Sequence, residues 1–325
     1  MNQDVSICVL SENEMGWTEP FELDEVQILD TYYLAAQKSD IAFLKKMDTA
    51  RLLAGFRTTA GIDTKGVRPY GGWEDSLLGG HCVGHYLTAI AQAVKATGDE
   101  ELKEKSQVLI EGLEECQRKL GTGFLFGAKV EDKEDVEKQF DILEGKKKGE
   151  TWVPWYNMHK VLAGLIDTYK YTENETALLI AEKLGDWIYE RVSKWDLKTN
   201  QKVLETEYGG MNDCLYELYS YSHKKHHLEA AQKFDEKALF LMAAKGEKNC
   251  LDGKHANTQI PKFIGAIKRY NVLKQLGEAK QDDEAYLADA EKFFEMVVKR
   301  HSFVTGGVSV MEHFRKDYHL DEVRT

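Results

Sequence analysis

The stretch KHANTQIPKFIGAIKRY, residues 254–270, decides the fold because it joins a polar segment to a helix pattern. Apolar residues at positions 260, 263, 264 and 267 fall on one stripe of a helix. Proline is tolerated in the first turn of a helix, where its missing N–H costs nothing. We therefore expect this helix to begin near Thr258, with Pro261 in its first turn.

The expected start of this helix carries side chains suited to a neutral polar ligand. His255, Asn257 and Gln259 lie where unpaired backbone donors and polar side chains converge. The hydroxyl groups of a sugar match such a set of donors and acceptors. We take these three residues as candidate substrate-binding residues.

The same arrangement recurs along the chain. First helices are expected over 87–95, 161–169 and 215–221, and second amphipathic helices over 102–116, 177–189, 228–242 and 286–298. Helix pairs that repeat every roughly 45 to 55 residues indicate an α/α array. Because aromatic and polar residues gather at the start of each first helix, we predict an all-α fold, a closed α/α barrel (toroid) whose inner helix starts meet in one cleft.

Composition is compatible with one large helical domain. The chain has 325 residues, of which 42% are hydrophobic, and only four prolines and no linker-like stretch interrupt it. We assign residues 1–30 to an N-terminal extension and 31–325 to the barrel, and the pattern over 39–56 predicts its first helix. The formal charge of −12 argues against nucleic-acid and anionic-membrane partners, which require basic surfaces.

The chain shows no targeting or membrane signal in its sequence. Residues 1–10 have neither a basic segment nor an apolar core, and no run of eighteen apolar residues occurs. We therefore expect a cytoplasmic protein. The odd number of cysteines and their scatter predict free, mostly buried thiols at Cys8, Cys82, Cys116, Cys214 and Cys250.

Two segments before residue 90 offer candidate ligand groups. The glycine-rich loop 57–80 carries Trp73, whose indole can lie flat over a sugar ring or, alternatively, plug the end of the barrel. His85 follows His81 by four residues, which puts both imidazoles on one helix face. Without a glutamate between them or a third ligand nearby, we expect a cap or a sugar hydrogen bond from His85 rather than a metal site.

Two later helix starts have the same character. Trp155 and His159 belong to WVPWYNMHK, residues 152–160, which is denser in ligand-capable groups than a structural helix start requires. Glu207 and Asn212 flank a Gly-Gly pair that permits close backbone approach, and both can bond to hydroxyls. A plain capping turn is the alternative for this second segment.

Glu312 is the candidate catalytic residue. It lies between Met311 and the His313-Phe314 pair, a half-apolar setting that suits a general acid. The segment follows the last recognisable helix, so we expect it beside the earlier helix starts. A surface glutamate with no catalytic role is the alternative.

Several motifs together resemble the catalytic domain of glycoside hydrolase family 127 and its sister family 146. They are YGGWE (70–74), GHCVGHYL (80–87), WYNMHK (155–160), EYGGMN (207–212), HANTQIPK (255–262) and TGG with EHF (305–314). The resemblance covers residues 26–314 and implies an (α/α)6 barrel followed by β-sandwich domains. It further implies retaining hydrolysis of β-L-arabinofuranosides by a cysteine nucleophile bound to a zinc that one glutamate and three cysteines ligate.

Carried onto this sequence, the resemblance implies that Glu312 is the general acid/base and that His159 and His255 bind arabinofuranose, with Asn212 beside another binding position. The family's zinc-binding and nucleophilic cysteines would lie beyond Thr325. We therefore expect a barrel incomplete at the C-terminus, with no metal ligands and no cofactor in this chain, although zinc belongs to the full-length family enzyme.

Three function classes follow from this pattern. The leading hypothesis is a β-L-arabinofuranosidase-like glycosidase acting on a small carbohydrate, in which these 325 residues alone can lack activity. A second is a carbohydrate-binding protein that keeps the cleft without catalysis. A third is an inverting α/α-barrel hydrolase or a sugar epimerase, which needs a second carboxylate such as Glu207, or a histidine pair, opposite Glu312.

Overall fold

The structure is a computed structural model that describes residues 20–320, and helices form all of the regular elements in this range. β-type pairing there is limited to isolated bridges of His313 with His255 and with Val310. The helices are α1 (Thr31–Lys46), α2 (Thr49–Thr59), η1 (Gly72–Asp75), α3 (His81–Thr97), α4 (Glu100–Leu120), α5 (Lys138–Leu143), α6 (Pro154–Thr172), α7 (Glu175–Val192), α8 (Leu197–Leu204), α9 (Met211–Ser222), α10 (Lys225–Gln232), α11 (Lys237–Ala244), α12 (Ala256–Gln275) and α13 (Gln281–Arg300). The predicted all-α class is confirmed.

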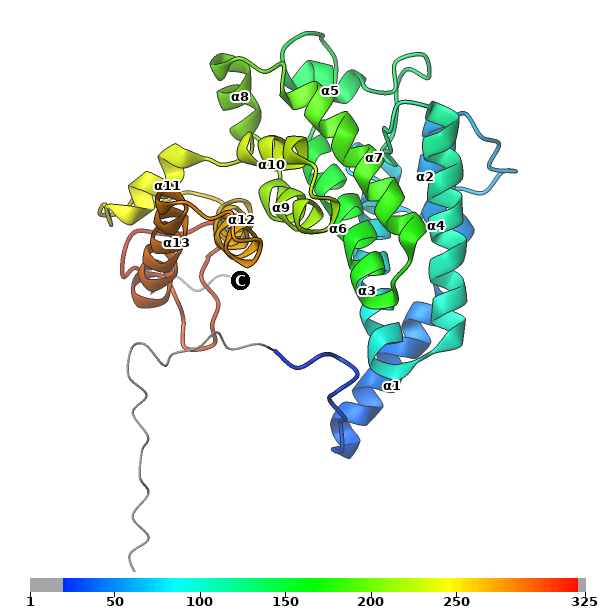
Figure 1. Ribbon diagram of the computed structural model, residues 1–325, viewed down its shortest axis with the longest axis horizontal. Coiled ribbons are helices and arrows are strands. Elements are labelled where there is room, and N and C mark those ends of the chain that lie inside the picture. Colours follow the sequence, from blue (N-terminus) through cyan, green and yellow to red (C-terminus); the bar gives the residue numbers. More distant parts are fainter. Residues whose placement is uncertain (1–19, 321–325) are drawn as a thin grey trace, which may run out of the picture.

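The helices are arranged in two rows that curve together. Along one row, α3 packs on α6, α6 on α9 and α9 on α12; along the other, α4 packs on α7 and α7 on α10. Contacts between the rows join each first helix to the second helix of its pair, as in α6 with α7 and α12 with α13. Figure 1 shows the rows as an arc, with α3, α6, α9 and α12 on the concave side. This is the architecture of an α/α barrel.

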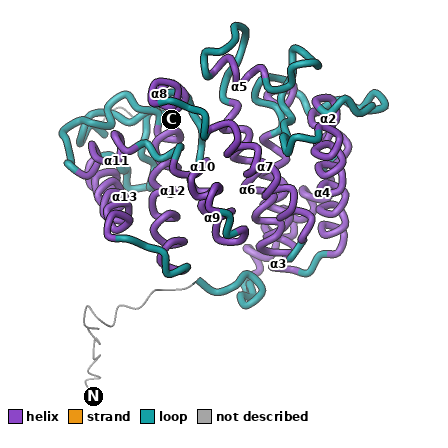
Figure 2. Tube along the Cα trace, turned by 45° about the horizontal axis from the view of Figure 1, so that its top comes forward, coloured by secondary structure: helices purple, strands orange, loops and turns teal. Residues whose placement is uncertain are grey.

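The first helices of the pairs lie alongside one another, and the long loops gather at one end of the array. Figure 2 shows α3, α6, α9 and α12 lying side by side, with long loops at one end of the array.

Side-chain caps fix several helix starts. The side chains of Asp48, Asp99 and Asn174 accept hydrogen bonds from the first free N–H groups of α2, α4 and α7. None of the helices within residues 20–320 combines the length and apolar character needed to cross a bilayer.

Two predicted helices are wrong in extent. The expected helix over 39–56 is two helices, because Met47 is extended and Asp48 caps a new start at Thr49. The expected helix over 228–242 divides into α10 and α11. Between them, Phe234 is buried in the aromatic core and the Asp235 carboxylate accepts a hydrogen bond from the Tyr216 hydroxyl at 2.6 Å. Tertiary contacts therefore outweigh helix continuity at this point.

The start of α12 also differs from the prediction. The helix begins at Ala256 with His255 as its N-cap, so Pro261 lies inside the helix beyond its first turn. A proline there removes the N–H that would bond to the carbonyl of Asn257. The predicted placement of Pro261 in the first turn is therefore wrong, while the expected position of His255 at the mouth of the helix holds.

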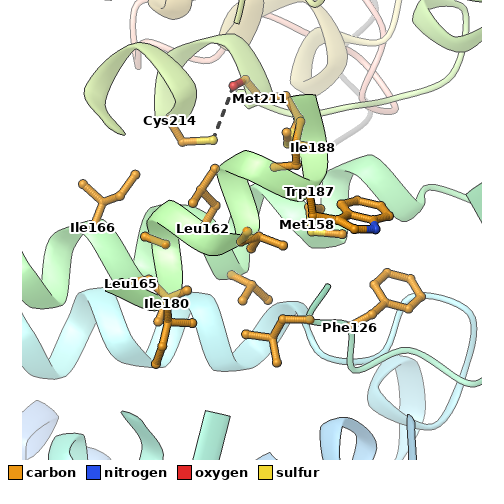
Figure 3. Packing of buried hydrophobic residues seen from close by; sticks show 14 of the residues in the cluster. Phe126, Met158, Leu162, Leu165, Ile166, Ile180, Trp187, Ile188, Met211 and Cys214 are labelled. Carbon is orange, nitrogen blue, oxygen red and sulfur yellow. Dashed lines mark hydrogen bonds between the residues drawn. The ribbon is translucent and has the colours of Figure 1, made fainter. Parts of the chain in front are cut away.

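Two buried apolar clusters support the array. The larger draws on α2 to α10 and joins residues from Leu52 to Phe234, while a smaller one from Leu239 to Phe314 lies under α11, α12 and α13. Figure 3 shows part of the larger cluster, where Met158 and Leu162 of α6 lie between Phe126 and Ile188. Cys214 is buried there, with its thiol bonded to the carbonyl of Met211 at 3.4 Å.

For the described part of the chain, the prediction of free thiols is confirmed, whereas only two of the four described cysteines are buried. All four described cysteines are free; Cys116 and Cys214 are buried, and Cys82 and Cys250 are partly exposed. Burial raises the pKa of the Cys116 thiol to about 12, so it remains protonated at neutral pH. Cys8 lies outside the described residues.

Candidate active site

A carboxylate, an imidazole and a second carboxylate meet at the start of α12. The Nε2 atom of His255 lies 3.4 Å from an oxygen of Glu312, and its Nδ1 atom lies 3.9 Å from an oxygen of Glu207. Glu207 precedes α9 and Glu312 follows α13, so segments far apart in the chain supply the three groups. The imidazole therefore lies between two carboxylates, one at each ring nitrogen.

The backbone fixes the position of Glu312. Its carbonyl accepts a hydrogen bond from the N–H of Ala256 at 2.8 Å, and His313 pairs with His255 through an isolated bridge. Met311 and Glu312 both have positive φ, 50° and 66°, which non-glycine residues adopt only where the surroundings hold them. This turn holds the side chain of Glu312 beside the start of α12.

The setting of Glu312 differs from the expected half-apolar one. Its side chain is 73% exposed, whereas those of Glu207 and His255 are 23% and 25% exposed. The prediction of a half-apolar setting for this carboxyl is therefore wrong. The neighbouring Met311 side chain is itself 66% exposed, so it does not cover Glu312 with apolar surface. Glu312 does lie beside the start of a first helix, as predicted, because its carboxylate is 3.4 Å from His255 at the start of α12.

The start of α6 meets the turn before α9 through His159. This imidazole is buried, and its Nδ1 atom accepts a hydrogen bond from the N–H of Gly210 at 3.1 Å. Gly209 has positive φ, and a Cβ atom there would lie 2.4 Å from Nδ1, so only glycine permits this approach. Burial, followed by the charges of Lys160 and His85, lowers the pKa of His159 well below its usual value. His159 is therefore neutral near pH 7, with Nδ1 as an acceptor.

The start of α3 faces the start of α6. His81 lies 6.1 Å from His85, 6.2 Å from Tyr156 and 6.5 Å from Trp73, measured between ring centroids. Trp73 is 66% exposed on η1 and His85 is exposed on the first turn of α3, so both predicted residues are accessible beside these rings. Desolvation, then the charges of Lys160 and His81, lower the pKa of His85.

Sequence reasoning missed the acidic partner of this group. Glu74 is buried; its carboxylate lies 2.8 Å from Nδ1 of His81 and accepts hydrogen bonds from the N–H groups of Gly80 at 2.9 Å and Cys82 at 3.2 Å. Desolvation opposes the charge on His81, but contacts with the Cys82 thiol and the Glu74 carboxylate outweigh it and raise the pKa of His81 to about 10. The sequence feature that could have indicated this pair is a glutamate placed six residues before Gly80-His81.

Lys160 was also missed, although it closes the WYNMHK motif. Its ammonium lies 4.9 Å from the ring centre of Tyr156, one helical turn earlier. Desolvation lowers the pKa of Lys160, and the Glu207 carboxylate partly offsets this. The start of α6 is thereby coupled electrostatically to Glu207 and, through His255, to Glu312.

Four predicted residues occupy other surroundings. Trp155 is 1% exposed and packs against Phe140, Trp195 and Phe234, so protein side chains cover its surface. Asn212 is fully buried, and its amide donates to the carbonyl of Lys262 at 3.1 Å.

The remaining two lie on α12. Gln259 is buried beside the ammonium of Lys262, at 3.5 Å, while Asn257 is exposed on the first turn. A binding role for these four residues stays a prediction. The structure itself gives packing roles to Trp155 and Asn212, since a ligand cannot reach a fully covered side chain without displacing protein.

Comparisons with known proteins bear on the family and the fold of the chain. A family model described as the GH127 catalytic domain of β-L-arabinofuranosidases matches residues 25–324. A solved GH127 β-L-arabinofuranosidase from Geobacillus stearothermophilus is similar at 16% identity with a TM-score of 0.58, over 90% of this chain and 48% of that one. A solved GH127 β-arabinofuranosidase is similar at 14% identity with a TM-score of 0.56, over 90% of this chain and 45% of that one.

The two solved structures support the fold alone, because sequence identities this low do not extend to function. This chain spans about half the length of each of them. No curated protein matches it. The family model, however, covers nearly the whole sequence, and on that ground the chain belongs to the GH127 β-L-arabinofuranosidase catalytic-domain family.

Proposed function

We propose that the chain is a glycoside hydrolase domain of the β-L-arabinofuranosidase type, with Glu312 as the general acid/base. The observation that carries the proposal is the Glu207–His255–Glu312 cluster at the start of α12. Membership of the GH127 family supplies the substrate class, a terminal β-L-arabinofuranoside.

The exposure of Glu312 suits a group that reaches the glycosidic oxygen of a bound saccharide. In its protonated form it donates that proton to the departing oxygen while a nucleophile, not identified among residues 20–320, bonds to the anomeric carbon. As a carboxylate it then takes a proton from the water that displaces this nucleophile. His255 lies against one edge of this carboxyl, and the hydroxyl of Thr258 holds the other ring nitrogen of His255 at 2.7 Å. The imidazole therefore serves to orient Glu312 beside the bound sugar.

The neighbouring helix starts supply groups for the remaining hydroxyls. His159 keeps a neutral ring locked onto the backbone of Gly210, so its orientation does not change with pH near neutrality. Glu207 accepts hydrogen bonds, and Lys160 donates them. The exposed indole of Trp73 offers a flat face for the C–H groups of a saccharide beyond the terminal sugar.

The zinc of the family is not matched by ligands within residues 20–320. The four cysteines there lie on separate elements, and two of them are buried as neutral thiols. The groups of potential metal ligands in this part of the chain are Glu74 with His81 and Cys82, and Asp186 with His226 and His227; neither is a glutamate with three cysteines. We therefore derive no catalytic step through zinc from these residues.

An inverting mechanism is the second candidate, and the position of Glu207 favours it. Glu207 and Glu312 lie at opposite nitrogens of one imidazole, 3.9 Å and 3.4 Å from it, so the ring of His255 lies between the two carboxyl groups. Inverting glycosidases hold their two carboxyl groups about 6.5–9.5 Å apart to leave room for water, whereas retaining ones use about 5–5.5 Å. With Glu207 as the base, water would attack the anomeric carbon while Glu312 protonates the departing oxygen.

The test is release of L-arabinose from a β-L-arabinofuranoside by this chain. We expect Glu312→Gln to lower kcat/KM by at least about 100-fold, because general acid catalysis contributes about 10²–10⁴. Glu291→Gln, an exposed glutamate on α13, is the matched control and leaves the rate unchanged.

NMR of the first-formed sugar separates the two mechanisms. If the sugar keeps its anomeric configuration and Glu207→Gln has little effect on the rate of hydrolysis, the nucleophile is a group other than Glu207. If the configuration is inverted and Glu207→Gln lowers the rate strongly, Glu207 acts as the base. Calorimetry with L-arabinose on wild type and His255→Ala measures binding independently. A chain that neither binds nor hydrolyses, or a Glu312→Gln variant with full activity, would contradict the proposal.

A further inference from the structure

A second cluster of ligand-type side chains lies away from the candidate active site, where α7 meets the start of α10. One oxygen of Asp186 lies 2.6 Å from Nε2 of His226 and 2.9 Å from Nε2 of His227. Neighbouring residues on a helix point in different directions, yet both imidazoles here turn the same nitrogen toward one carboxylate oxygen. The rings stand 4.5 Å apart at 76° to each other, so they approach from two sides.

Partners outside this trio hold it in place. His227 is fully buried, and its Nδ1 atom lies 2.8 Å from the hydroxyl of Ser222. Metal-ligating histidines almost always have such a partner on the second nitrogen, which fixes the ring and its tautomer. The ammonium of Lys224 lies 3.2 Å from the other oxygen of Asp186 and 3.4 Å from the oxygen that faces the imidazoles, and it also pairs with Glu182 at 3.0 Å. A metal at the trio would take the place of this longer contact.

Access and spacing fit a metal with an open coordination position. The side chains of Asp186 and His226 are 43% and 35% exposed, so water can reach the trio from one side. Bonds of about 2.0–2.1 Å in a tetrahedral zinc site place ligand atoms roughly 3.3 Å apart. The observed separations of 2.6 and 2.9 Å would therefore widen by about 0.7 and 0.4 Å, which a rotation of the partly exposed side chains of Asp186 and His226 can supply.

The buried imidazole can present a free nitrogen to a metal. It needs only the tautomer in which Nδ1–H donates to the hydroxyl of Ser222, 2.8 Å away, and Nε2 is left free. The serine hydroxyl can donate or accept, so it accommodates either tautomer.

We propose that Asp186, His226 and His227 form a binding site for one divalent transition-metal ion, with Zn²⁺ as its representative. Two imidazoles and one carboxylate are the ligands that zinc and its neighbours in the first transition row prefer, whereas Mg²⁺ and Ca²⁺ prefer all-oxygen sites. The ion would link α7 to α10, and water would complete its coordination. Sequence reasoning predicted no metal site in this chain because Asp186 lies 40 residues before His226.

The cluster of Glu74, His81 and Cys82 is a weaker candidate for the same ion. The oxygens of Glu74 already accept hydrogen bonds from Gly80 and Cys82, and one nitrogen of His81 is directed at both Glu74 and the carbonyl of Leu78. It does, however, contain a thiol, which gives the two clusters different spectroscopic signatures.

Titration of Zn²⁺ into the chain tests the proposal. We expect saturable binding of one ion to wild type, and a loss of affinity of at least about tenfold in His226→Ala and in Asp186→Asn, since even second-shell changes cost about 10–100-fold. His223→Asn is the matched control. It removes a nearby exposed histidine at a positive-φ position that asparagine tolerates, and it leaves zinc affinity unchanged.

Two further measurements distinguish this site from the thiol-containing cluster. Co²⁺ bound at Asp186, His226 and His227 gives no thiolate-to-cobalt charge-transfer band, whereas binding at Cys82 does. We expect Zn²⁺ to raise the melting temperature of wild type and of Cys82→Ser but not that of His226→Ala. Mg²⁺ leaves the melting temperatures of all three proteins unchanged. The absence of saturable zinc binding, binding undiminished in both ligand variants, or a thiolate band in wild type would overturn the proposal and leave the trio as an ion pair.

Discussion

Glu74 and His81 show how two side chains create a charge that neither would hold alone. An imidazole buried by itself loses its proton, yet the pKa of His81 rises to about 10 because Cys82 and the Glu74 carboxylate together outweigh desolvation. The pKa of Glu74 is lowered: desolvation would raise it, but His81 and two backbone N–H groups prevail. A charged pair thus lies beneath Trp73 at the start of α3.

The pH dependence of stability follows from these directions. His81 has a folded pKa above its ordinary 6.5, so its contribution is complete below about pH 6.5 and is lost as the pH rises toward about 10. Glu74 has a folded pKa below its ordinary 4.5, so its contribution is present above that value and is lost as the pH falls. The pair stabilises the fold most between these two ordinary values.

We therefore predict that the free energy of unfolding of wild type, relative to Glu74→Gln, decreases between about pH 6.5 and pH 10. Urea denaturation at several pH values measures it. Glu104→Gln, on the exposed face of α4, is the control and gives a constant difference from wild type. A Glu74→Gln difference that is also constant across this range would show that His81 is not charged in the folded protein.

At the scale of elements, α3 and α6 approach each other through two glycines. A Cβ atom on Gly84 would lie 1.9 Å from the carbonyl oxygen of Lys160, and one on Gly164 would lie 2.5 Å from the carbonyl oxygen of Gly84. These are backbone contacts, so the helices cannot relieve them by changing a rotamer. The close crossing also sets the distance between His81 and Tyr156, which begin the two helices.

We predict that Gly84→Ala destabilises the protein by about 1–3 kcal/mol or more, because overpacking a close contact forces the backbone to move. Chemical denaturation measures the loss, and reduced binding of L-arabinose would follow from the wider spacing of the two helix starts. Gly71→Ala is the matched control, since a Cβ there meets nothing within 4 Å. Equal stability of the two variants would mean that α3 and α6 can separate without cost.

Across the whole molecule, a buried ionic network joins the two apolar clusters. Arg269 of α12 bonds to Asp235 at 3.0 Å and to Asp283 of α13 at 2.7 Å, and its guanidinium lies 4.0 Å from the ring centre of Tyr286. The Asp235 side chain is fully buried, and it also accepts a hydrogen bond from Tyr216 of α9. The network therefore connects the segment between α10 and α11 with three helices.

Arg269→Met is predicted to lower the free energy of unfolding by about 3–5 kcal/mol, since it leaves buried carboxylates without their partner. Trp155, Trp187 and Trp195 belong to the larger cluster and no tryptophan follows Trp195, so tryptophan fluorescence reports on the larger cluster and not on the smaller one, whereas circular dichroism reports on all helices. We expect the two signals to coincide in wild type and to separate in the variant, with circular dichroism changing first. Arg118→Met, at an exposed position of α4, is the control, and coincident transitions in both variants would contradict the prediction.

The sequence by itself determined the helices, their pairing and the residues at their starts. Helical periodicity and Asp or Asn caps depend on neighbours within a few positions, so α4, α7 and α13 could be predicted from the sequence alone. The recurrence of polar motifs at the first helix of each pair likewise predicted that the helix starts would meet and that Glu312 would lie beside them; the structure brings His255 and Glu312 together in this way, with Glu207 as a third member.

Only the tertiary structure decided which of those polar residues are accessible. Asn212 belongs to the same motif as Glu207, yet packing buries Asn212 fully and leaves the Glu207 side chain 23% exposed, and Trp155 and His159 of another motif are both buried. It also decided the break at Asp235, the charge on His81 and the approach of Asp186 to two histidines. The physical reason is common to all of these: burial and partner distance come from segments remote in the chain, and no local pattern encodes them.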